Sequence, residues 1–268
     1  VEAVKKRMAI SDVPVGVLLS GGLDSSLLVA LASENGFKPK SFTIGFEDQP
    51  EEKGNEFEYS DLVAERYQTE HYRFHIPNDQ VLSRLPEAVG EMSEPMFGQD
   101  AVAFYLLSEQ VSREVKVVLS GQGADEVFAG YFWYPKMAEQ FAQCGDEIQS
   151  FAPFYFDRSH EELMSMVTRR FRGPDVTSQR VKQGLGDSKD GPFTNRVLGF
   201  DISTLIVDDP VKRVDNMTMA WGLEARVPFL DTKLVETAMR IPPEFKLDQG
   251  GKGVLKNLAR SRIPDAVI

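Results

Sequence analysis

The chain has 268 residues, enough to bury a large core in one domain or in two closely packed domains. Hydrophobic residues make up 42% of the chain and charged residues 26%, as in an ordinary globular protein. No apolar run approaches the roughly 18 residues that cross a bilayer, and residues 1–10 lack the apolar core of a signal peptide. We therefore expect a cytoplasmic protein with no membrane partner. The formal net charge of −11 opposes nonspecific attraction to nucleic acid, and we expect no nucleic-acid partner.

The cysteine content excludes two kinds of site. Cys144 is the only cysteine, so an intramolecular disulfide and a metal site built on several thiolates are both excluded. The sequence lacks an initiator methionine, and we expect it to be a piece of a longer protein.

Strand and helix patterns alternate along the first half. The apolar run at residues 15–19 is typical of a strand buried on both faces of a parallel sheet, and the run at 25–33 predicts the helix that follows it. Further strands are predicted at 41–46, 71–76 and 115–119, and further helices at 59–67, 78–92 and 101–114. This alternation predicts an α/β fold with a parallel sheet flanked by helices.

The pattern changes from about Trp133 onward. Aromatic residues, methionines and polar loops replace the buried runs, so we expect a mainly helical second half with no further buried strand. Within it, Glu224 and Arg226 are interpreted as an internal ion pair that ties a helix to the core.

A glycine-rich loop, SGGLDSS at residues 20–26, joins the first predicted strand to the first helix. A helix N-terminus presents free N–H groups to an anion, and the two glycines let the backbone approach closely. Ser20, Ser25 and Ser26 add hydroxyl donors, whereas Asp24 would repel phosphate unless a divalent cation lies between them. The alternative is an ordinary turn with Asp24 or Ser25 as the N-cap, but the combination favours an anion site.

A second such loop, SGQGADE at residues 120–126, follows the strand predicted at 115–119. Ligands of open parallel sheets bind beyond the carboxyl ends of the strands. If the two strands are close, Asp24 and Asp125 can share one Mg²⁺ on a pyrophosphate. The alternative for Asp125 is favourable acidity in the first turn of a helix.

These motifs resemble a known family. The first loop resembles the PP-loop, SGGxDSS, of enzymes that cleave ATP to AMP and pyrophosphate to activate an oxygen. Together with the second loop, FTIGF at 42–46, RVDNMTMAWGLEARVPFLD at 213–231 and GGKGVLK at 250–256, it makes residues 15–260 similar to the synthetase domain of glutamine-dependent asparagine synthetases. The resemblance implies an adenine nucleotide alpha hydrolase-like fold, the cofactors ATP and Mg²⁺, and adenylation of a small carboxylate that is then transferred to ammonia.

Roles for individual residues follow from the same resemblance. Leu18 and Ile44 are placed against adenine, Asp24 and Asp125 hold Mg²⁺, and Lys252 stabilises negative charge at the adenylate or during attack by the amine. The implied nucleotide-binding set is Leu18, Leu19, Ser20, Gly21, Gly22, Asp24, Ser25, Ser26, Ile44, Ser120, Gly121 and Asp125.

Gln122 departs from the family pattern, in which this place of the second loop commonly holds an acidic residue. A carboxamide cannot act as a base, so either this substrate does not need the acid or another group supplies it. The string at 120–135 is similar to a bacterial branch, the N-acetylglutaminylglutamine amidotransferases, which amidate the C-terminal carboxylate of a small acylated dipeptide. We therefore expect Gln122 to take part in amidating that dipeptide. Aspartate amidation, another PP-loop activation reaction and a degenerate nucleotide-binding module are the alternatives.

The predicted organisation is one synthetase-type domain over residues 1–268. A nucleotide-binding α/β core is expected at about 13–135 and a mainly helical, substrate-side part at about 136–268. The family's N-terminal glutaminase domain uses a first-residue cysteine, whereas this chain begins with Val1 and has only Cys144, so that domain is expected to be absent. Ammonia would then come from the missing domain or from added ammonium, and a homodimer is left open.

Overall fold

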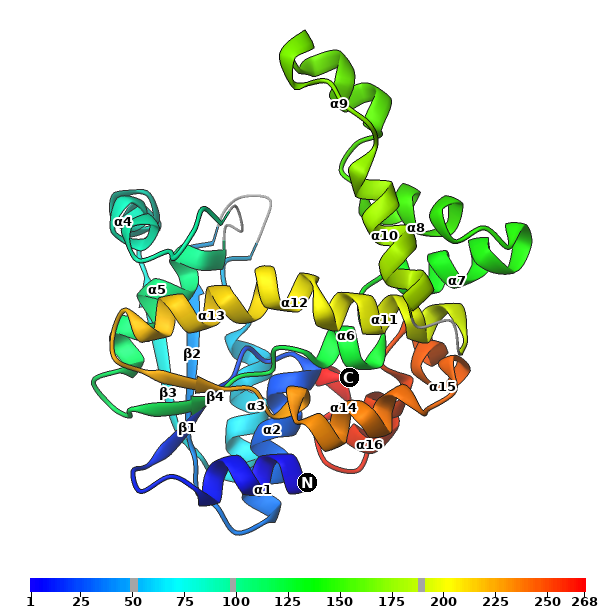
Figure 1. The fold of residues 1–268 in the computed structure, drawn as a ribbon. Helices are drawn as coiled ribbons and strands as arrows, with labels where there is room; N and C mark the ends of the chain where they lie inside the picture. The colour runs from blue at the N-terminus through cyan, green and yellow to red at the C-terminus, as the bar shows by residue number, and fades with distance from the viewer. Residues whose placement is uncertain (49–52, 97–99, 188–190) are drawn as a thin grey trace.

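The computed structural model describes residues 1–48, 53–96, 100–187 and 191–268 (Figure 1). Within these residues, five strands form one sheet in the order β3-β2-β1-β4-β5, and all neighbouring strands are parallel. The strands are β1 (Val15–Leu18), β2 (Lys40–Phe46), β3 (Glu70–Ile76), β4 (Val117–Leu119) and β5 (Glu224–Arg226). The predicted α/β fold, a parallel sheet flanked by helices, is confirmed.

The two faces of the sheet pack in separate cores. Val17 and Leu119 pack on one face with helices α2 and α3, whereas Leu18 and Val118 pack on the other face with Leu107 of α5. Because both faces are covered, β1 and β4 are continuous apolar runs without alternation. The helices of this part are α1 (Glu2–Ala9), α2 (Leu23–Glu34), α3 (Phe57–Tyr67), α4 (Asn78–Gly90), α5 (Asp100–Val111) and α6 (Ala124–Phe128).

A further core, rich in aromatic residues, is centred on Tyr134, Phe151 and Leu198. The remaining helices follow α6 in the chain. They are α7 (Trp133–Cys144), α8 (Glu147–Tyr155), α9 (His160–Met166), α10 (Val176–Asp187), α11 (Phe193–Ser203), α12 (Leu205–Asp208), α13 (Pro210–Met219), α14 (Thr232–Met239), α15 (Pro243–Leu247) and α16 (Gly253–Ala259), with short 3-10 turns η1 (Arg169–Phe171), η2 (Pro228–Leu230), η3 (Asp248–Gly250) and η4 (Asp265–Val267). Helix α9 has no buried residue and projects away from the body of the molecule (Figure 1). Among the described residues, no helix combines the length and apolar character needed to span a membrane.

Strand β5 lies in the half of the chain where no further buried strand was expected, and its residues are exposed or only partly buried. It adds to the sheet beside β4, where the Glu224 N–H donates to the Lys116 carbonyl at 2.9 Å and the Ser120 N–H donates to the Arg226 carbonyl at 2.9 Å. The predicted ion pair between Glu224 and Arg226 exists, with Nε 2.7 Å from Oε1, but it lies on this strand, and the Glu224 side chain is 56% exposed. The C-terminal half of the chain therefore supplies the strand next to the second loop, and the predicted division near residue 135 stays a prediction.

Candidate functional site

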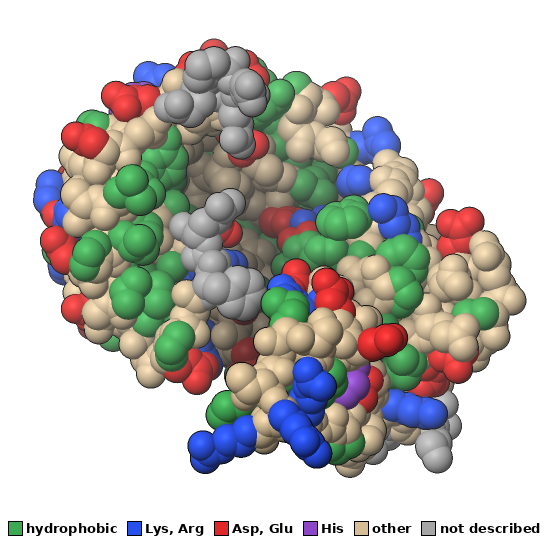
Figure 2. All heavy atoms as spheres, turned by 90° about the horizontal axis from the view of Figure 1, so that it is seen from above, with side chains coloured by type: hydrophobic (Ala, Val, Ile, Leu, Met, Phe, Trp, Pro, Cys, Tyr) green, Lys and Arg blue, Asp and Glu red, His purple; other side chains and the backbone are tan. Residues whose placement is uncertain are grey.

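The two glycine-rich loops meet at one end of the sheet. Strands β1 and β4 are neighbours, with Val17 opposite Leu119, so the loops that follow them lie side by side. The chain runs outward from β1 to β2 and β3 and then returns to β4 on the other side of β1, which makes this a point where the strand order reverses. Open α/β sheets bind ligands in the crevice beyond the carboxyl ends of the strands at such a point. Figure 2 shows a hollow in the surface at this end of the molecule.

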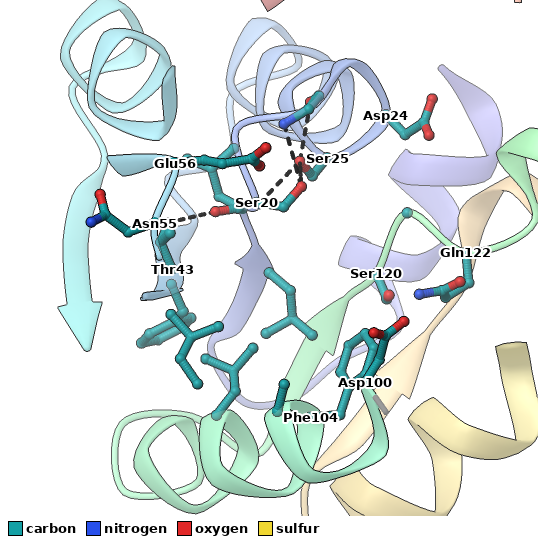
Figure 3. Close-up of a pocket in the computed structure, with 18 of the residues that line it drawn as sticks. Ser20, Asp24, Ser25, Thr43, Asn55, Glu56, Asp100, Phe104, Ser120 and Gln122 are labelled. Carbon is teal, nitrogen blue, oxygen red and sulfur yellow. Dashed lines mark hydrogen bonds between the residues drawn. The ribbon is translucent and has the colours of Figure 1, made fainter. Parts of the chain in front are cut away.

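A cavity of about 650 Å³ occupies this crevice, within the size range of small-molecule sites. One part of its wall is apolar and comes from β1, β2 and α5, with Leu18, Phe42, Ile44, Phe104 and Leu107. The other part is polar and is lined by Ser20, Gly22, Asp24, Ser25, Thr43, Lys53, Gly54, Asn55, Glu56, Asp100, Ser120, Gly121, Gln122 and Asp125, most of which are labelled in Figure 3. An apolar slot beside a polar end suits a ligand that joins a flat aromatic group to a polar group.

The first loop is held in shape by its own hydrogen bonds. The Ser20 N–H donates to the Ser25 hydroxyl at 3.2 Å, the two hydroxyls are 3.0 Å apart, and the Gly22 N–H donates to the Ser20 hydroxyl at 3.3 Å (Figure 3). Gly21 has a φ of +90°, and a Cβ there would come within 2.9 Å of the Tyr59 Cβ. Glycine is therefore required at this position, both for its conformation and for its close contact with α3.

Most of the predicted site residues line the cavity, but three do not. Gly21 packs against α3, and the Ser26 side chain is fully buried inside the protein, with a hydroxyl that has no hydrogen-bond partner among the described residues. Lys252 does not line the cavity either, although its ammonium contacts two residues that do.

The ammonium of Lys252 lies between the two carboxylates that were singled out from the loops. Its Nζ is 2.5 Å from Asp24 Oδ2 and 2.7 Å from Asp125 Oδ1. Burial raises the pKa of Asp24 to about 6, against the attraction of Lys252. Burial also disfavours the charged form of Lys252, but the charges of Asp24 and Asp125 outweigh it and raise the pKa of this lysine. The ammonium therefore stays charged and joins the first loop to the second.

The two aspartates can be tested as Mg²⁺ ligands. Asp24 Oδ1 is buried and has no hydrogen-bond partner within the described ranges, so one carboxylate oxygen is available to a cation. In those same ranges no cluster of three or more His, Cys, Asp or Glu residues is arranged to hold a metal. Because Mg²⁺ is often held by only one or two carboxylates together with substrate phosphates and waters, the donor set fits Mg²⁺ that binds along with a polyphosphate.

The cavity also contains residues that the sequence patterns did not identify, including Asn55, Glu56 and Asp100. Asp100 is the first residue of α5, and Figure 3 shows its carboxylate directed toward the same part of the cavity as Ser120 and Gln122. Nη1 of Arg213 is 3.6 Å from its Oδ2. An acidic residue in the first turn of a helix ordinarily indicates a favourable interaction with the helix dipole, so its position carried no functional signal.

Sequence comparisons match nearly the whole chain. The sequence model of the asparagine synthase family matches residues 1–268. The chain is 28% identical to glutamine-hydrolysing asparagine synthetase 1 of Bacillus subtilis, over 96% of this chain and 45% of the relative. It is 30% identical to a glutamine-hydrolysing asparagine synthetase of Zea mays, over 92% of this chain and 34% of the relative. The chain thus spans less than half the length of these relatives.

Proposed function

The chain belongs to the asparagine synthase family, and from this premise we propose that it uses ATP to adenylate a carboxylate and transfers the acyl group to ammonia. The observation that carries the proposal is the position of Lys252, whose ammonium contacts Asp24 and Asp125 at the polar end of a cavity with an apolar slot. A cation held beside two loops that follow neighbouring strands is suited to reactions in which negative charge develops.

Each part of the site has a role in this proposal. The apolar wall with Leu18 and Ile44 takes the adenine ring, and the hydroxyls and N–H groups of the first loop bind phosphate oxygens. Lys252 stabilises the negative charge that develops on the reacting groups. Asp24 and Asp125 would hold Mg²⁺, which when bound neutralises part of the phosphate charge.

For the carboxylate substrate we propose a small acylated dipeptide such as N-acetylglutaminylglutamine. Gln122 lines the cavity and offers a hydrogen-bond donor and an acceptor without adding charge, which suits an amide-rich substrate. Aspartate is the second candidate, because the relatives at 28% and 30% identity are named asparagine synthetases. The charged contacts of Lys252 with Asp24 and Asp125 argue against a degenerate module that only binds a nucleotide.

The test is ATP–pyrophosphate exchange with Mg²⁺ and a panel containing aspartate, N-acetylglutaminylglutamine, a β-amino acid and no carboxylate. Exchange that depends on the dipeptide supports the proposal in full. Exchange with aspartate alone keeps the reaction and replaces the substrate. ATP binding without exchange on any carboxylate would leave the nucleotide-binding module as the correct reading.

A further inference from the structure

The Lys252 side chain passes close to Gly130, which has no side chain of its own. Gly130 lies just beyond α6, and a Cβ at this residue would lie under 3.0 Å from both Asp125 Oδ1 and Lys252 Cε. The φ angle of Gly130 is not positive, so an alanine could adopt its backbone conformation. A side chain at residue 130 is therefore excluded by the space that the Lys252 and Asp125 side chains occupy, not by the backbone conformation.

The loop that carries Lys252 is pressed against the same segment. Lys252 has a left-handed backbone with a φ of 54° and a ψ of 25°, and its N–H donates to the Phe128 carbonyl at 3.1 Å. Gly251 has a φ of +114°, and a Cβ there would lie under 3.0 Å from the Ala129 carbonyl oxygen. Non-glycine residues keep a left-handed conformation only where the surrounding structure enforces it. Backbone contacts with residues 128–130 thus fix where the lysine side chain starts.

We propose that Gly130 is a positioning residue for Lys252, because its missing side chain leaves the passage through which the ammonium reaches Asp24 and Asp125. The three atoms that an added methyl group would meet are Oδ1 and Cγ of Asp125 and Cε of Lys252, all of them side-chain atoms, so we expect these side chains to move while the backbone stays in place. Gly251 differs, since a methyl group there would meet a backbone oxygen. The inference rests on the proposed function only in taking Lys252 as a catalytic residue.

The experiment compares Gly130→Ala with Gly199→Ala in α11, a control whose Cβ would meet no atom within 4 Å. Acylation of Lys252 by an amine-reactive reagent, quantified by peptide mass spectrometry, reports whether the ammonium is still held between the carboxylates. We expect faster acylation in Gly130→Ala, a circular dichroism spectrum like that of the unsubstituted chain, and substrate-dependent exchange lowered by about 100-fold, as misplaced catalytic groups can cause. Gly199→Ala should change none of these.

A double-mutant cycle separates positioning from a general packing effect. Gly130→Ala should lower the unfolding midpoint in urea in the unsubstituted chain but much less in a Lys252→Ala background, where the crowded lysine is gone and Asp125 is free to move. Equal losses in both backgrounds, or unchanged Lys252 acylation in folded Gly130→Ala, would overturn the inference. If the unsubstituted chain shows no exchange at all, only the proposed function fails, because acylation and unfolding still report the position of Lys252.

Discussion

Asp24, Asp125 and Lys252 form a three-residue cluster with one ammonium and two carboxylates. The single positive charge offsets the repulsion between the two carboxylates, and burial makes the negative charge of Asp24 costly, as its raised pKa shows. Removing the lysine leaves the carboxylates facing each other without compensation. The effect of a substitution here therefore depends on charge as well as on the contact that is lost.

We expect Lys252→Ala to lower the turnover of substrate-dependent exchange by about 100-fold or more while ATP affinity changes little. The ammonium acts mainly where charge develops, and Asp24 and Asp125 remain in place to hold Mg²⁺. Turnover from steady-state kinetics and ATP affinity from calorimetry check the prediction, with the exposed Lys233→Ala as the matched control. A tenfold loss of ATP affinity at normal turnover would make Lys252 an ordinary nucleotide contact.

Gln122 is the position where substrate choice can be tested. A glutamate there would add a negative charge to a cavity that already contains Asp100 and Asp125, and it would remove an N–H donor. If the dipeptide is the substrate, we expect Gln122→Glu to lower its adenylation by about tenfold or more with little effect on folding. Exchange rates over a dipeptide concentration series measure this, and Gln183→Glu on the exposed side of α10 is the control. The idea fails if the unsubstituted chain activates aspartate well and ignores the dipeptide.

At the scale of elements, the burial of both sheet faces explains which strands could be predicted from the sequence. Strands β1 to β4 were identified from their sequence patterns, and β1 and β4 are uninterrupted buried runs. Strand β5 has only three residues, of which Glu224 is exposed, and it is defined by backbone hydrogen bonds to its neighbours. No apolar run marks such a strand, so it could not be predicted.

The candidate site was predictable to a similar extent. Both glycine-rich loops are local patterns, and the adjacency of β1 and β4 brings them together. The partners of Lys252 were not predictable from local patterns, because Asp24 lies 228 residues away in the chain. Asp100 and Gly130 were missed for a related reason, since their importance lies in contacts with residues on other elements.

Asp201 joins three helices of the aromatic-rich core, the one centred on Tyr134, Phe151 and Leu198, through its carboxylate. This fully buried α11 residue accepts hydrogen bonds from the hydroxyls of Tyr134 in α7 at 2.6 Å and Tyr155 in α8 at 3.0 Å. Its pKa is raised to about 7, mainly by burial and in small part by the charge of Glu126, whereas the two hydrogen bonds act in the opposite direction. The ionised form is therefore costly in the folded protein.

The sign of the resulting pH dependence follows from proton binding. Between the usual pKa of 3.8 and about 7, the folded chain holds a proton on Asp201 that the unfolded chain has lost, so this group's contribution to stability falls as pH rises through that window. Asp201→Asn stays neutral, and we expect its free energy of unfolding to lack this fall. The difference between the two proteins, measured by urea unfolding from pH 4 to 8, should grow with pH and level off above about 7. Parallel pH profiles would show that Asp201 does not titrate in this way.

At the scale of the whole molecule, the candidate site is assembled from both halves of the chain. Asp24 and Asp125 belong to loops that follow strands in the first half, whereas Lys252 and strand β5 come from the second. A fragment that ends near residue 135 would keep both glycine-rich loops but lose the ammonium that joins them. The predicted nucleotide-binding core is therefore incomplete as a catalytic unit without the helical part.

The last prediction at this scale concerns the nitrogen source of the proposed reaction. The relatives named above are glutamine-hydrolysing, and this chain spans less than half their length. The only cysteine, Cys144, is exposed at the end of α7, where its sulfur lies 3.4 Å from the Ser150 hydroxyl, and it is not among the residues that line the cavity. We therefore expect ammonium salts, but not glutamine, to support amide formation by this chain.

Product formation followed by mass spectrometry with ¹⁵N-labelled ammonium or with amide-labelled glutamine would check this expectation. The rate should increase with pH where ammonium gives up its proton, because free ammonia is the nucleophile, and Cys144→Ser should leave the rate unchanged. Label transferred from glutamine by the unsubstituted chain but not by Cys144→Ser would instead make Cys144 a glutaminase nucleophile. Transfer that survives the substitution would require a hydrolytic group other than a thiol, since the sequence holds no second cysteine.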